Sequence, residues 1–414
     1  MPSGEIEFVA YGSLNIYITG NPQITFFKSV YRRHTNFAIE SIEQTFIQIP
    51  QFGKKTSITL SKNGDLVHNM YALVTLPILQ SPNFYIYGVG NALFKKIELS
   101  IGSFIIDTHY SDWLNIWNEL TTDTGKIIGY DRMVYNYYNK PSVSSITCYV
   151  PLQFWFNRNP GLALPLVALQ FHDITLNFEF ETMELLSNNA ATSATNLDCR
   201  IYANFIYLDI DERRLFSQHS HEYLIEQVQY NEFTISSGIS FYNAKLNFKL
   251  PIKELIWIHT PSLISTYGMY DYSCANPNTL DMHTFTNGKL TMNGSDRFVE
   301  RNADYFYLLQ NYQHHTHVPR TQFIHKTYND NLTELTSGYY RNYIYTYSFA
   351  LEPENHQPNG CCNFSRLKNA ELQLKYDITS SYYSYNYTRV LKVFAVNYNI
   401  LKVSNGMAGL ILSN

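Results

Sequence analysis

The chain has 414 residues, more than one hydrophobic core usually serves, so we expect two domains of about 200 residues each. Apolar residues make up 45% and charged residues 15%, which argues against intrinsic disorder. The formal net charge of −4 argues against direct genome packaging, which requires a strong positive field. An aromatic content of 16%, with 35 Tyr and 26 Phe, favours half-buried strands and assembly interfaces.

The first residues, Met-Pro-Ser-Gly-Glu-Ile-Glu, are acidic and contain no apolar core of the kind that a secretory signal needs. No stretch of the chain reaches about 18 consecutive apolar residues, the length of a membrane-spanning helix. We therefore expect cytosolic synthesis as a soluble protein. An N-terminal arm of roughly residues 1–22 is expected to precede the first regular strand.

Alternation of apolar and polar residues with a period of two is the dominant pattern, and it is typical of strands that bury one face. The clearest run is Ile174–Phe180, in which four apolar side chains alternate with Thr175, Asn177 and Glu179. Further strands are predicted in the second half at Leu246–Leu250, Tyr343–Leu351 and Leu372–Tyr376.

Five Asn-Gly dipeptides supply the positive φ angles that tight hairpin turns require. They begin at Asn63, Asn287, Asn293, Asn359 and Asn405. Many antiparallel strands are implied, so the chain is predicted to be all-β, with two similar domains that are each long enough for an eight-stranded sandwich with long loops.

Two short helices interrupt the strand pattern. In Asp112–Leu120, Asp112 is positioned to cap the N-terminus while Trp113 and Trp117 fall on one buried face. The second helix is predicted over Asp211–Gln227, near the midpoint of the chain, where it marks a domain boundary. Between them, Pro151–Leu166 is too often interrupted by proline for a membrane helix and is predicted to be an ordered corner between strands.

Candidate binding residues are few. His314, His315 and His317 resemble a metal site because residues two apart on a strand face the same way, but no carboxylate or cysteine stands at a familiar spacing, so a structural or loop role is favoured. The basic runs at residues 31–34 and 212–214 are interpreted as interface or intramolecular ion pairs in preference to phosphate contacts.

Nucleophile, nucleotide-binding and metalloprotease motifs are absent from the sequence, although two carboxylates for glycoside hydrolysis could still meet in a β-sandwich. The odd number of cysteines, without Cys-x-x-Cys spacing, predicts free thiols in preference to disulfides or zinc. They are Cys148, Cys199, Cys274, Cys361 and Cys362.

Four sequons are candidate N-glycosylation sites, and all lie in the second half of the chain. They begin at Asn293, Asn331, Asn363 and Asn386. Because some sequons arise by chance in a chain rich in Asn, Ser and Thr, and no secretory signal is present, glycosylation stays open.

A series of sequence blocks runs in order over nearly the whole chain. FVAYGSLNIYITGNPQITFFKSVYRRHTNFAIESIEQTF opens the series and FAVNYNILKVSNGMAGLILSN closes it. The blocks are Phe8–Phe46, Ile101–Thr121, Pro151–His172, Tyr207–Gln229, Leu250–Trp257, Leu290–Phe298, Tyr347–Leu367 and Phe394–Asn414. In this order they resemble the major capsid proteins of nucleocytoplasmic large DNA viruses, a family that includes proteins of chlorella viruses, iridoviruses and mimiviruses.

The resemblance implies two consecutive eight-stranded antiparallel jelly-roll sandwiches, with a few short helices in loops and between the domains. The expected divisions are an arm at 1–22, a first jelly roll at 23–210, an interdomain segment at 211–222 and a second jelly roll at 223–414. It also implies a homotrimeric, pseudo-hexagonal capsomer in an icosahedral shell over an internal membrane.

The expected partners are further copies of the chain and the minor capsid and penton proteins, with no direct nucleic acid contact. The expected location is the virion, after synthesis in the host cytoplasm. No catalytic residue, cofactor or metal is expected. Two alternatives stay open: a minor capsid or scaffold paralogue of the same fold, and a jelly-roll module that binds carbohydrate or a receptor. An enzyme on this fold is a more distant third.

Overall fold

The structure is a computed structural model that describes residues 12–79, 83–137, 144–188, 196–261, 269–273, 283–321, 323–329, 332–338, 342–377 and 388–412. The chain divides into two compact units, Met1–Asn36 and Phe37–Asn414. In the first unit the described residues form one short helix, α2 (Ile16–Thr19), and residues 12–36 are all exposed. The second unit holds the other described elements.

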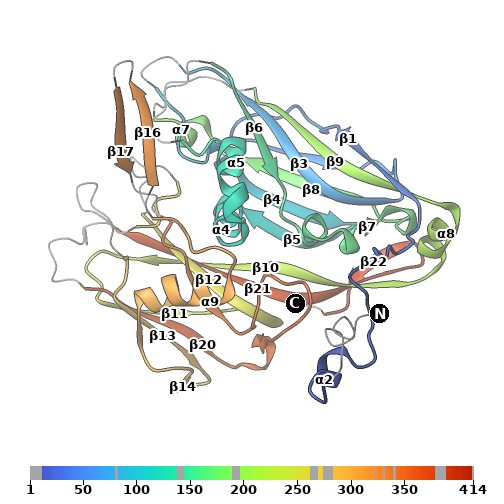
Figure 1. The fold of residues 1–414 in the computed structure, drawn as a ribbon. Coiled ribbons are helices and arrows are strands. Elements are labelled where there is room, and N and C mark those ends of the chain that lie inside the picture. The colour runs from blue at the N-terminus through green and yellow to red at the C-terminus, as the bar shows by residue number, and fades with distance from the viewer. Residues whose placement is uncertain are drawn as a thin grey trace. The chain divides into compact units, whose positions relative to one another are not determined.

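The first half of the second unit contains two antiparallel sheets (Figure 1). One has the strand order β1-β9-β3-β6, with β7 paired to β3; its bounds are β1 (Phe37–Gln44), β9 (Asp198–Leu208), β3 (Leu66–Leu76), β6 (Ile146–Pro151) and β7 (Leu164–Pro165). The other has the order β2-β8-β4-β5; its bounds are β2 (Lys55–Thr59), β8 (Ile174–Phe180), β4 (Phe94–Ile101) and β5 (Phe104–Tyr110).

The second half repeats this arrangement. One sheet has the order β10-β21-β12-β18, with β19 on β12 and β22 on β21; its bounds are β10 (His221–Ile235), β21 (Arg389–Ser404), β12 (Pro251–Pro261), β18 (Tyr345–Ser348), β19 (Cys362–Asn363) and β22 (Met407–Leu410). The other has the order β11-β20-β13-β14, with β15 on β13; its bounds are β11 (Phe241–Lys245), β20 (Ala370–Lys375), β13 (Asn287–Met292), β14 (Ser295–Asp296) and β15 (Arg301–Asn302). A separate hairpin pairs β16 (Phe323–Asn329) with β17 (Leu332–Gly338).

The two halves share one strand order. In the first half β1 pairs with β9 and β9 with β3, while β2, β4 and β5 belong to the other sheet. In the second half β10 pairs with β21 and β21 with β12, while β11, β13 and β14 belong to the other sheet. This interleaving is the jelly roll, a sandwich of two sheets built from Greek keys. The predicted fold class, two consecutive antiparallel jelly rolls with few helices, is therefore confirmed. The count of eight strands in each stays a prediction, since these sheets hold from four to six strands in the described part of the chain.

The strand predicted at Ile174–Phe180 is confirmed as β8, with its four apolar side chains buried and the three polar ones between them half-buried. Phe178 packs against Phe94 with ring centroids 6.0 Å apart, and against Phe46 at 5.7 Å. Burying an aromatic side chain of this size stabilises the fold by roughly 1.5–3 kcal/mol. The alternation thus placed one face of the strand in the core.

The strand predicted at Leu246–Leu250 is only half right. Its apolar side chains are buried in alternation, but β11 ends at Lys245. Beyond it the backbone amides of Asn247 and Lys249 are bonded by side chains of β10, Asn231 Oδ1 at 2.9 Å and Gln229 Oε1 at 3.0 Å. Side-chain oxygens thus accept the hydrogen bonds that a neighbouring strand would otherwise accept. The segment keeps the alternating burial of a strand but is not part of a sheet.

Of the other two predicted strands, the first coincides with β18 over four residues and the second with β20, in which Leu372 and Leu374 are buried. The Asn-Gly prediction is right at two of the five positions. Asn293-Gly294 and Asn405-Gly406 have left-handed φ angles and turn β13 into β14 and β21 into β22.

At the other three dipeptides the hairpin prediction is wrong. Asn287-Gly288 lies inside β13, and neither residue of Asn63-Gly64 has a positive φ. Gly360 of Asn359-Gly360 does have a positive φ, 143°, but the strands on either side, β18 and β19, each pair with β12. At these positions the backbone conformation is determined by pairing and packing with distant segments and not by the local dipeptide.

The first predicted helix is confirmed as α4 (Ser111–Thr121), but the predicted cap is wrong. The N-cap is Tyr110, with no side-chain cap bond, and the carboxylate of Asp112 bonds to Lys392 instead. The second predicted helix is right only as far as α8 (Ile210–Gln218). Residues from His221 onward pair residue by residue with β21, and this long pairing overrides the local preference.

The remaining helical segments are short and lie between strands. They are α3 (Val89–Ala92), α5 (Thr124–Val134), α6 (Trp155–Arg158), α7 (Met183–Leu186), α9 (Gln310–His314), the 3-10 turns η1 (Pro160–Leu162), η2 (Leu166–Ala168) and η4 (Phe364–Arg366), and a π-helical turn η3 (Tyr305–Leu309). The corner predicted at Pro151–Leu166 is confirmed, with α6, η1 and β7 inside it. Among the described residues, no helix has the length and apolarity to span a membrane.

Candidate functional site: the seam between the jelly rolls

Helix α4 is buried on all sides, from Ser111 to Leu120. One face carries Trp113, which packs against Phe394 of β21 with ring centroids 5.7 Å apart. Its polar residue Asp112 accepts hydrogen bonds from Lys392 at 2.6 Å and from the Tyr272 hydroxyl at 3.1 Å. We call the contact region of α4, α6 and β5 with β10, β12 and β21 the seam.

An ion-pair triad lies at the centre of the seam. Glu226 of β10 accepts from Arg158 of α6 at 2.9 Å and from Lys253 of β12 at 2.5 Å. The Lys253 side chain is 0% exposed, that of Glu226 7% and that of Arg158 18%. Burial lowers the pKa of Arg158, and Glu226 opposes that change. Each charge in the triad is thus desolvated and depends on its partner.

Backbone groups of the two jelly rolls are joined by side chains next to the triad. Asp107 of β5 accepts from the backbone amide of Val228 at 3.0 Å and also contacts His109 at 3.0 Å. Gln227 of β10 donates to the carbonyl of Ile106. Because β5 and β10 are edge strands of their sheets, these bonds satisfy backbone groups that no neighbouring strand pairs, and they fix the register of the seam.

Arg320 extends the contact between the jelly rolls beyond α4. Its guanidinium bonds to Glu119 of α4 at 2.6 Å and to Asp131 of α5 at 2.7 Å. Burial lowers the pKa of Arg320, but the two carboxylates outweigh it, and the pKa lies above its ordinary value. Nearby, the backbone amide of His317 donates to the carbonyl of Leu120 at 2.9 Å.

The predicted histidine cluster does not converge on a common point. The His314 ring is bonded to the carbonyl of Leu351 at 2.8 Å and the His317 ring to that of Glu119 at 3.1 Å. His315 is buried between two carboxylates that come from distant parts of the chain. No group of three His, Cys, Asp or Glu residues is placed to hold a metal within the ranges that the structure describes.

The basic run at 212–214 contains an intramolecular ion pair, as the favoured interpretation expected, with Arg213 2.9 Å from Asp65. The run at 31–34 lies in the exposed N-terminal unit. Cys148 and Cys199 are buried free thiols, and burial raises the pKa of Cys148 to about 12. Cys361 is free and exposed, Cys362 is free and half-buried, and Cys274 lies outside the described residues.

Two of the four sequons can be placed. Asn293 is exposed in the β13–β14 turn, and its Oδ1 accepts from the amide of Lys368 at 2.8 Å. Asn363 is exposed at the start of η4 and accepts from the amide of Ser365 at 3.0 Å. Asn331 and Asn386 lie outside the described residues.

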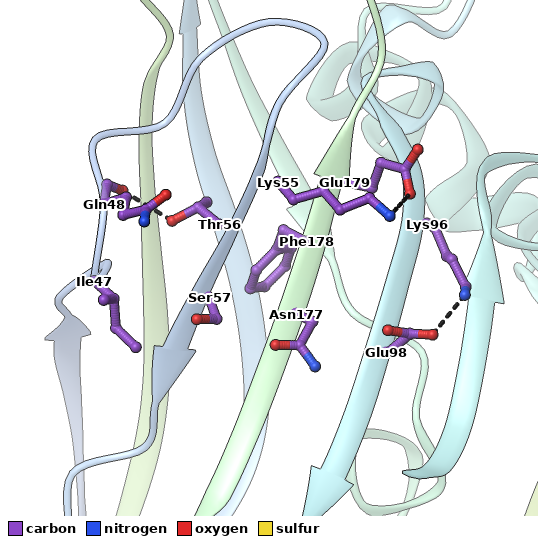
Figure 2. Close-up of a pocket in the computed structure, with 10 residues that line it drawn as sticks. All are labelled: Ile47, Gln48, Lys55, Thr56, Ser57, Lys96, Glu98, Asn177, Phe178 and Glu179. Carbon is purple, nitrogen blue, oxygen red and sulfur yellow. Dashed lines mark hydrogen bonds and ion pairs between the residues drawn. The ribbon is translucent and has the colours of Figure 1, made fainter.

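A hollow of about 290 Å³ lies on the outer face of β2, β8 and β4, and Figure 2 shows its polar lining. Its two carboxylates are both paired: Glu98 with Lys96 at 2.5 Å, and Glu179 with Lys55 at 3.1 Å. Burial raises the pKa of Glu179, but hydrogen bonds from Lys55 and Lys95 outweigh it, so the pKa lies below its ordinary value. A general acid at neutral pH needs the opposite shift, so Glu179 lacks the raised pKa of such an acid.

Exposed apolar residues occur on three segments that backbone hydrogen bonds join in two pairs. The amide of Gly102, in the β4–β5 turn, donates to the carbonyl of Asp173 at 2.9 Å, and that of Phe171 donates to Gly406, in the β21–β22 turn, at 2.9 Å. We call the exposed apolar residues of these segments the apolar patch: Phe104 (59% exposed), Ile105 (57%), Phe171 (74%) and Met407 (49%). Exposed apolar patches commonly mark interaction sites.

Two jelly rolls of one strand order, fixed by a buried seam, define a double jelly-roll subunit. The family model for the major capsid protein N-terminus matches residues 25–209, and that for the large eukaryotic DNA virus major capsid protein matches residues 212–343 and 333–409. The chain is 45% identical over 429 residues to the major capsid protein of Pyramimonas orientalis virus and 35% identical over 462 residues to that of Paramecium bursaria Chlorella virus 1, covering 100% of each chain.

Solved structures agree. The capsid protein VP54 of the chlorella virus PBCV-1 superimposes with a TM-score of 0.78 at 32% identity, over 94% of this chain and 100% of that one. The Faustovirus major capsid protein, at 11% identity and a TM-score of 0.71 over 95% of each chain, shows the same fold. The chain belongs to the major capsid proteins of large eukaryotic DNA viruses. It is a structural protein of the virion and forms the capsid shell.

Sequence reasoning missed the seam, although one signal was visible. Lys253 and Glu254 stand side by side within the apolar stretch Leu250–Trp257. Charged residues in an otherwise buried strand require partners of opposite charge. Lys253 and Glu254 therefore indicated that buried ion pairs exist in this region. The partners themselves lie far away in the chain and could not be identified from the residues around Lys253 and Glu254.

Proposed function

We propose that three copies of this chain assemble into a capsomer with a pseudo-hexagonal outline, which tiles an icosahedral shell. The observation that carries the proposal is the repeated strand order of the two jelly rolls within one chain. Three chains with two similar sandwiches each present six comparable columns, and a six-fold outline packs over a flat facet with repeated contacts.

Two features support this assembly. The seam holds the two sandwiches in one orientation through buried charges, as a tile with a fixed outline requires. The apolar patch leaves aromatic and aliphatic area uncovered on the single chain. Aromatic side chains of this kind are enriched at protein interfaces.

Solution mass tests the trimer. One chain has a mass of 48.2 kDa, so a trimer has a mass of about 145 kDa. We expect sedimentation equilibrium of the purified protein to give the trimer mass across a wide concentration range. A protein that stays strictly monomeric at high concentration would refute the proposed trimeric capsomer.

Further partners belong to the same proposal: minor capsid and penton proteins, and an internal membrane close to the shell, without direct nucleic acid contact. The N-terminal segment of roughly residues 1–22 is proposed to reach a neighbouring capsomer or an underlying minor capsid protein. Its described residues include exposed Ile16, Tyr17 and Ile18. Deleting the segment and recovering unaltered trimers and unaltered shells would contradict this role.

We also propose that the chain has no catalytic activity, cofactor or metal, and that its domains divide at α8 as the sequence predicts. The paired carboxylates of the hollow in Figure 2 support the first point. The sequons at Asn293, Asn331, Asn363 and Asn386 stay candidate glycosylation sites. Intact mass measurement of virion-derived protein tests them, because each glycan adds a discrete mass.

A further inference from the structure

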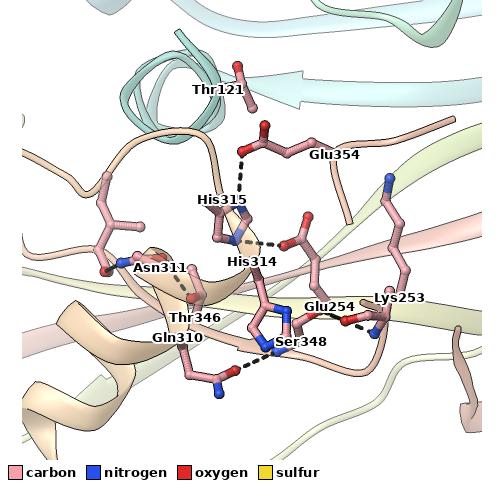
Figure 3. Close-up of polar contacts among 12 residues, drawn as sticks. Thr121, Lys253, Glu254, Gln310, Asn311, His314, His315, Thr346, Ser348 and Glu354 are labelled. Carbon is pink, nitrogen blue, oxygen red and sulfur yellow. Dashed lines mark hydrogen bonds and ion pairs between the residues drawn. The ribbon is translucent and has the colours of Figure 1, made fainter. Parts of the chain in front are cut away.

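His315 directly follows α9 and is placed between two carboxylates, as Figure 3 shows. Its Nδ1 lies 3.0 Å from Oε1 of Glu354, in the segment 349–361, and its Nε2 lies 3.2 Å from Oε2 of Glu254, on β12. The side chains of His315 and Glu254 are 0% exposed and that of Glu354 is 17% exposed. Three segments that are far apart in the sequence therefore meet at one imidazole ring.

Both ring nitrogens of His315 face carboxylate oxygens. A neutral imidazole carries one N–H, so one nitrogen would direct its lone pair at an anionic oxygen about 3 Å away. An imidazolium carries an N–H on each nitrogen and suits both contacts. Neither buried oxygen of Glu254, nor Nε2 of His315, has a hydrogen-bond partner among the described residues. The 3.2 Å contact between them is therefore an ion pair, and the imidazolium is the charge partner of Glu254.

The surrounding charges are balanced only if His315 is protonated. Glu254 and Glu354 face the ring directly. The next charged groups along β12 are those of the triad, in which Glu226 is matched with both Lys253 and Arg158. These six groups carry three positive and three negative charges when His315 is an imidazolium. The neighbouring rings of His314 and His317 turn away to backbone carbonyls.

We propose that His315 is a protonated clamp that fastens the segment 349–361 to β12 and to the end of α9, and that the segment is released when alkaline pH removes the proton. Glu354 is the movable side of the clamp because the segment 349–361 lies outside any helix or strand. The carboxylate also accepts hydrogen bonds from the amide and the hydroxyl of Thr316. The fixed side is Glu254, within a strand that is paired with β21 and β18.

The protonation equilibrium has the sign that such a clamp needs. Burial lowers the pKa of His315, but Glu254 and Glu354 outweigh burial and raise it to about 9 from an ordinary value of 6.5. A base with a raised pKa in the closed state contributes its full stabilisation below the ordinary pKa and loses it as pH rises through the raised one. The clamp is therefore closed at neutral pH and opens progressively between 6.5 and 9.

Hydrogen exchange of the purified full-length protein tests the clamp, with mass spectrometry of peptides that cover the segment 349–361. After correction for the intrinsic effect of pH on exchange, we expect the opening equilibrium to rise by about tenfold per pH unit between neutral pH and about 9, because one proton is released on opening. Peptides from β8 are expected to show no such rise. A segment whose corrected exchange is independent of pH would overturn the proposal.

His315→Gln is expected to abolish the pH-dependent rise. The matched control His314→Gln, a half-buried neighbour whose ring is bonded to the backbone carbonyl of Leu351, is expected to keep it. Persistence of the rise in His315→Gln, or its loss in His314→Gln, would contradict the assignment. If His315→Gln does not fold, Glu354→Gln decides: it removes one of the two carboxylates that raise the pKa of the closed state, so the rise should level off at a lower pH and be smaller. An unchanged profile in Glu354→Gln would refute the clamp.

Discussion

Removing the charge of Glu226 is expected to destabilise the protein strongly, because this one carboxylate is matched with two buried cations. The change is Glu226→Gln, which keeps the shape and one acceptor oxygen. At an effective dielectric constant of about 20, two unit charges separated by the 2.5 Å between Glu226 and Lys253 attract by about 7 kcal/mol before desolvation is counted. Breaking such a pair leaves an uncompensated buried charge, with a net cost of about 3–5 kcal/mol.

Urea unfolding followed by tryptophan fluorescence measures this cost. The matched control is Glu222→Gln on the same strand, where the partner Lys402 is 3.1 Å away and the two side chains are 55% and 48% exposed. An exposed pair contributes about 0–1 kcal/mol, so the control should change the free energy of unfolding little. Adding Lys253→Met to Glu226→Gln should recover part of the loss, because it removes the cation left without a partner.

Equal losses of unfolding free energy in Glu226→Gln and Glu222→Gln would contradict this expectation. So would a double variant, Glu226→Gln with Lys253→Met, whose loss of unfolding free energy equals the sum of the losses in the two single variants. Either result would mean that the charges of the seam are screened by solvent and contribute like a surface pair.

Three further changes have defined outcomes. Burial, with a smaller effect of Arg389, lowers the pKa of His259 to about 3 from 6.5. Between these two pH values His259 is therefore protonated in the unfolded chain and neutral in the folded chain. Stability should therefore fall by about 1.4 kcal/mol per pH unit below about 6.5, and His259→Gln should remove that part of an acid unfolding curve. Gly406→Ala should lower the urea midpoint more than Gly294→Ala: both have left-handed φ, but a Cβ at Gly406 would lie 2.5 Å from the Phe171 ring, whereas one at Gly294 meets nothing within 4 Å. Arg320→Lys should cost about 1.5–3 kcal/mol in thermal unfolding, since an ammonium cannot reproduce the guanidinium fork on two carboxylates, and an unchanged Tm would contradict this.

Local patterns predicted those parts of the fold that local physics controls. Ile174–Phe180 became a strand because its period-two alternation matches a sheet with one face in the core. The helix predicted over Asp211–Gln227 ends at Gln218, although the helical pattern of the sequence continues, because residues from His221 onward pair with β21. The prediction was also wrong for Asp112, which has the chemistry of a cap but bonds across the seam to Lys392.

The sequence by itself determined the class of this protein. Alternation and turns predicted two similar all-β domains, and the resemblance of the ordered blocks to a capsid family implied two consecutive jelly rolls. Only the tertiary structure decided how its buried charges are matched. His315 stood in a run that suggested a metal, yet its partners are Glu254 and Glu354, and Lys253 bonds to Glu226 of another strand. Strand alternation depends on neighbours in the chain, whereas ion pairing depends on which strands the fold places side by side, and that information is spread over the whole sequence.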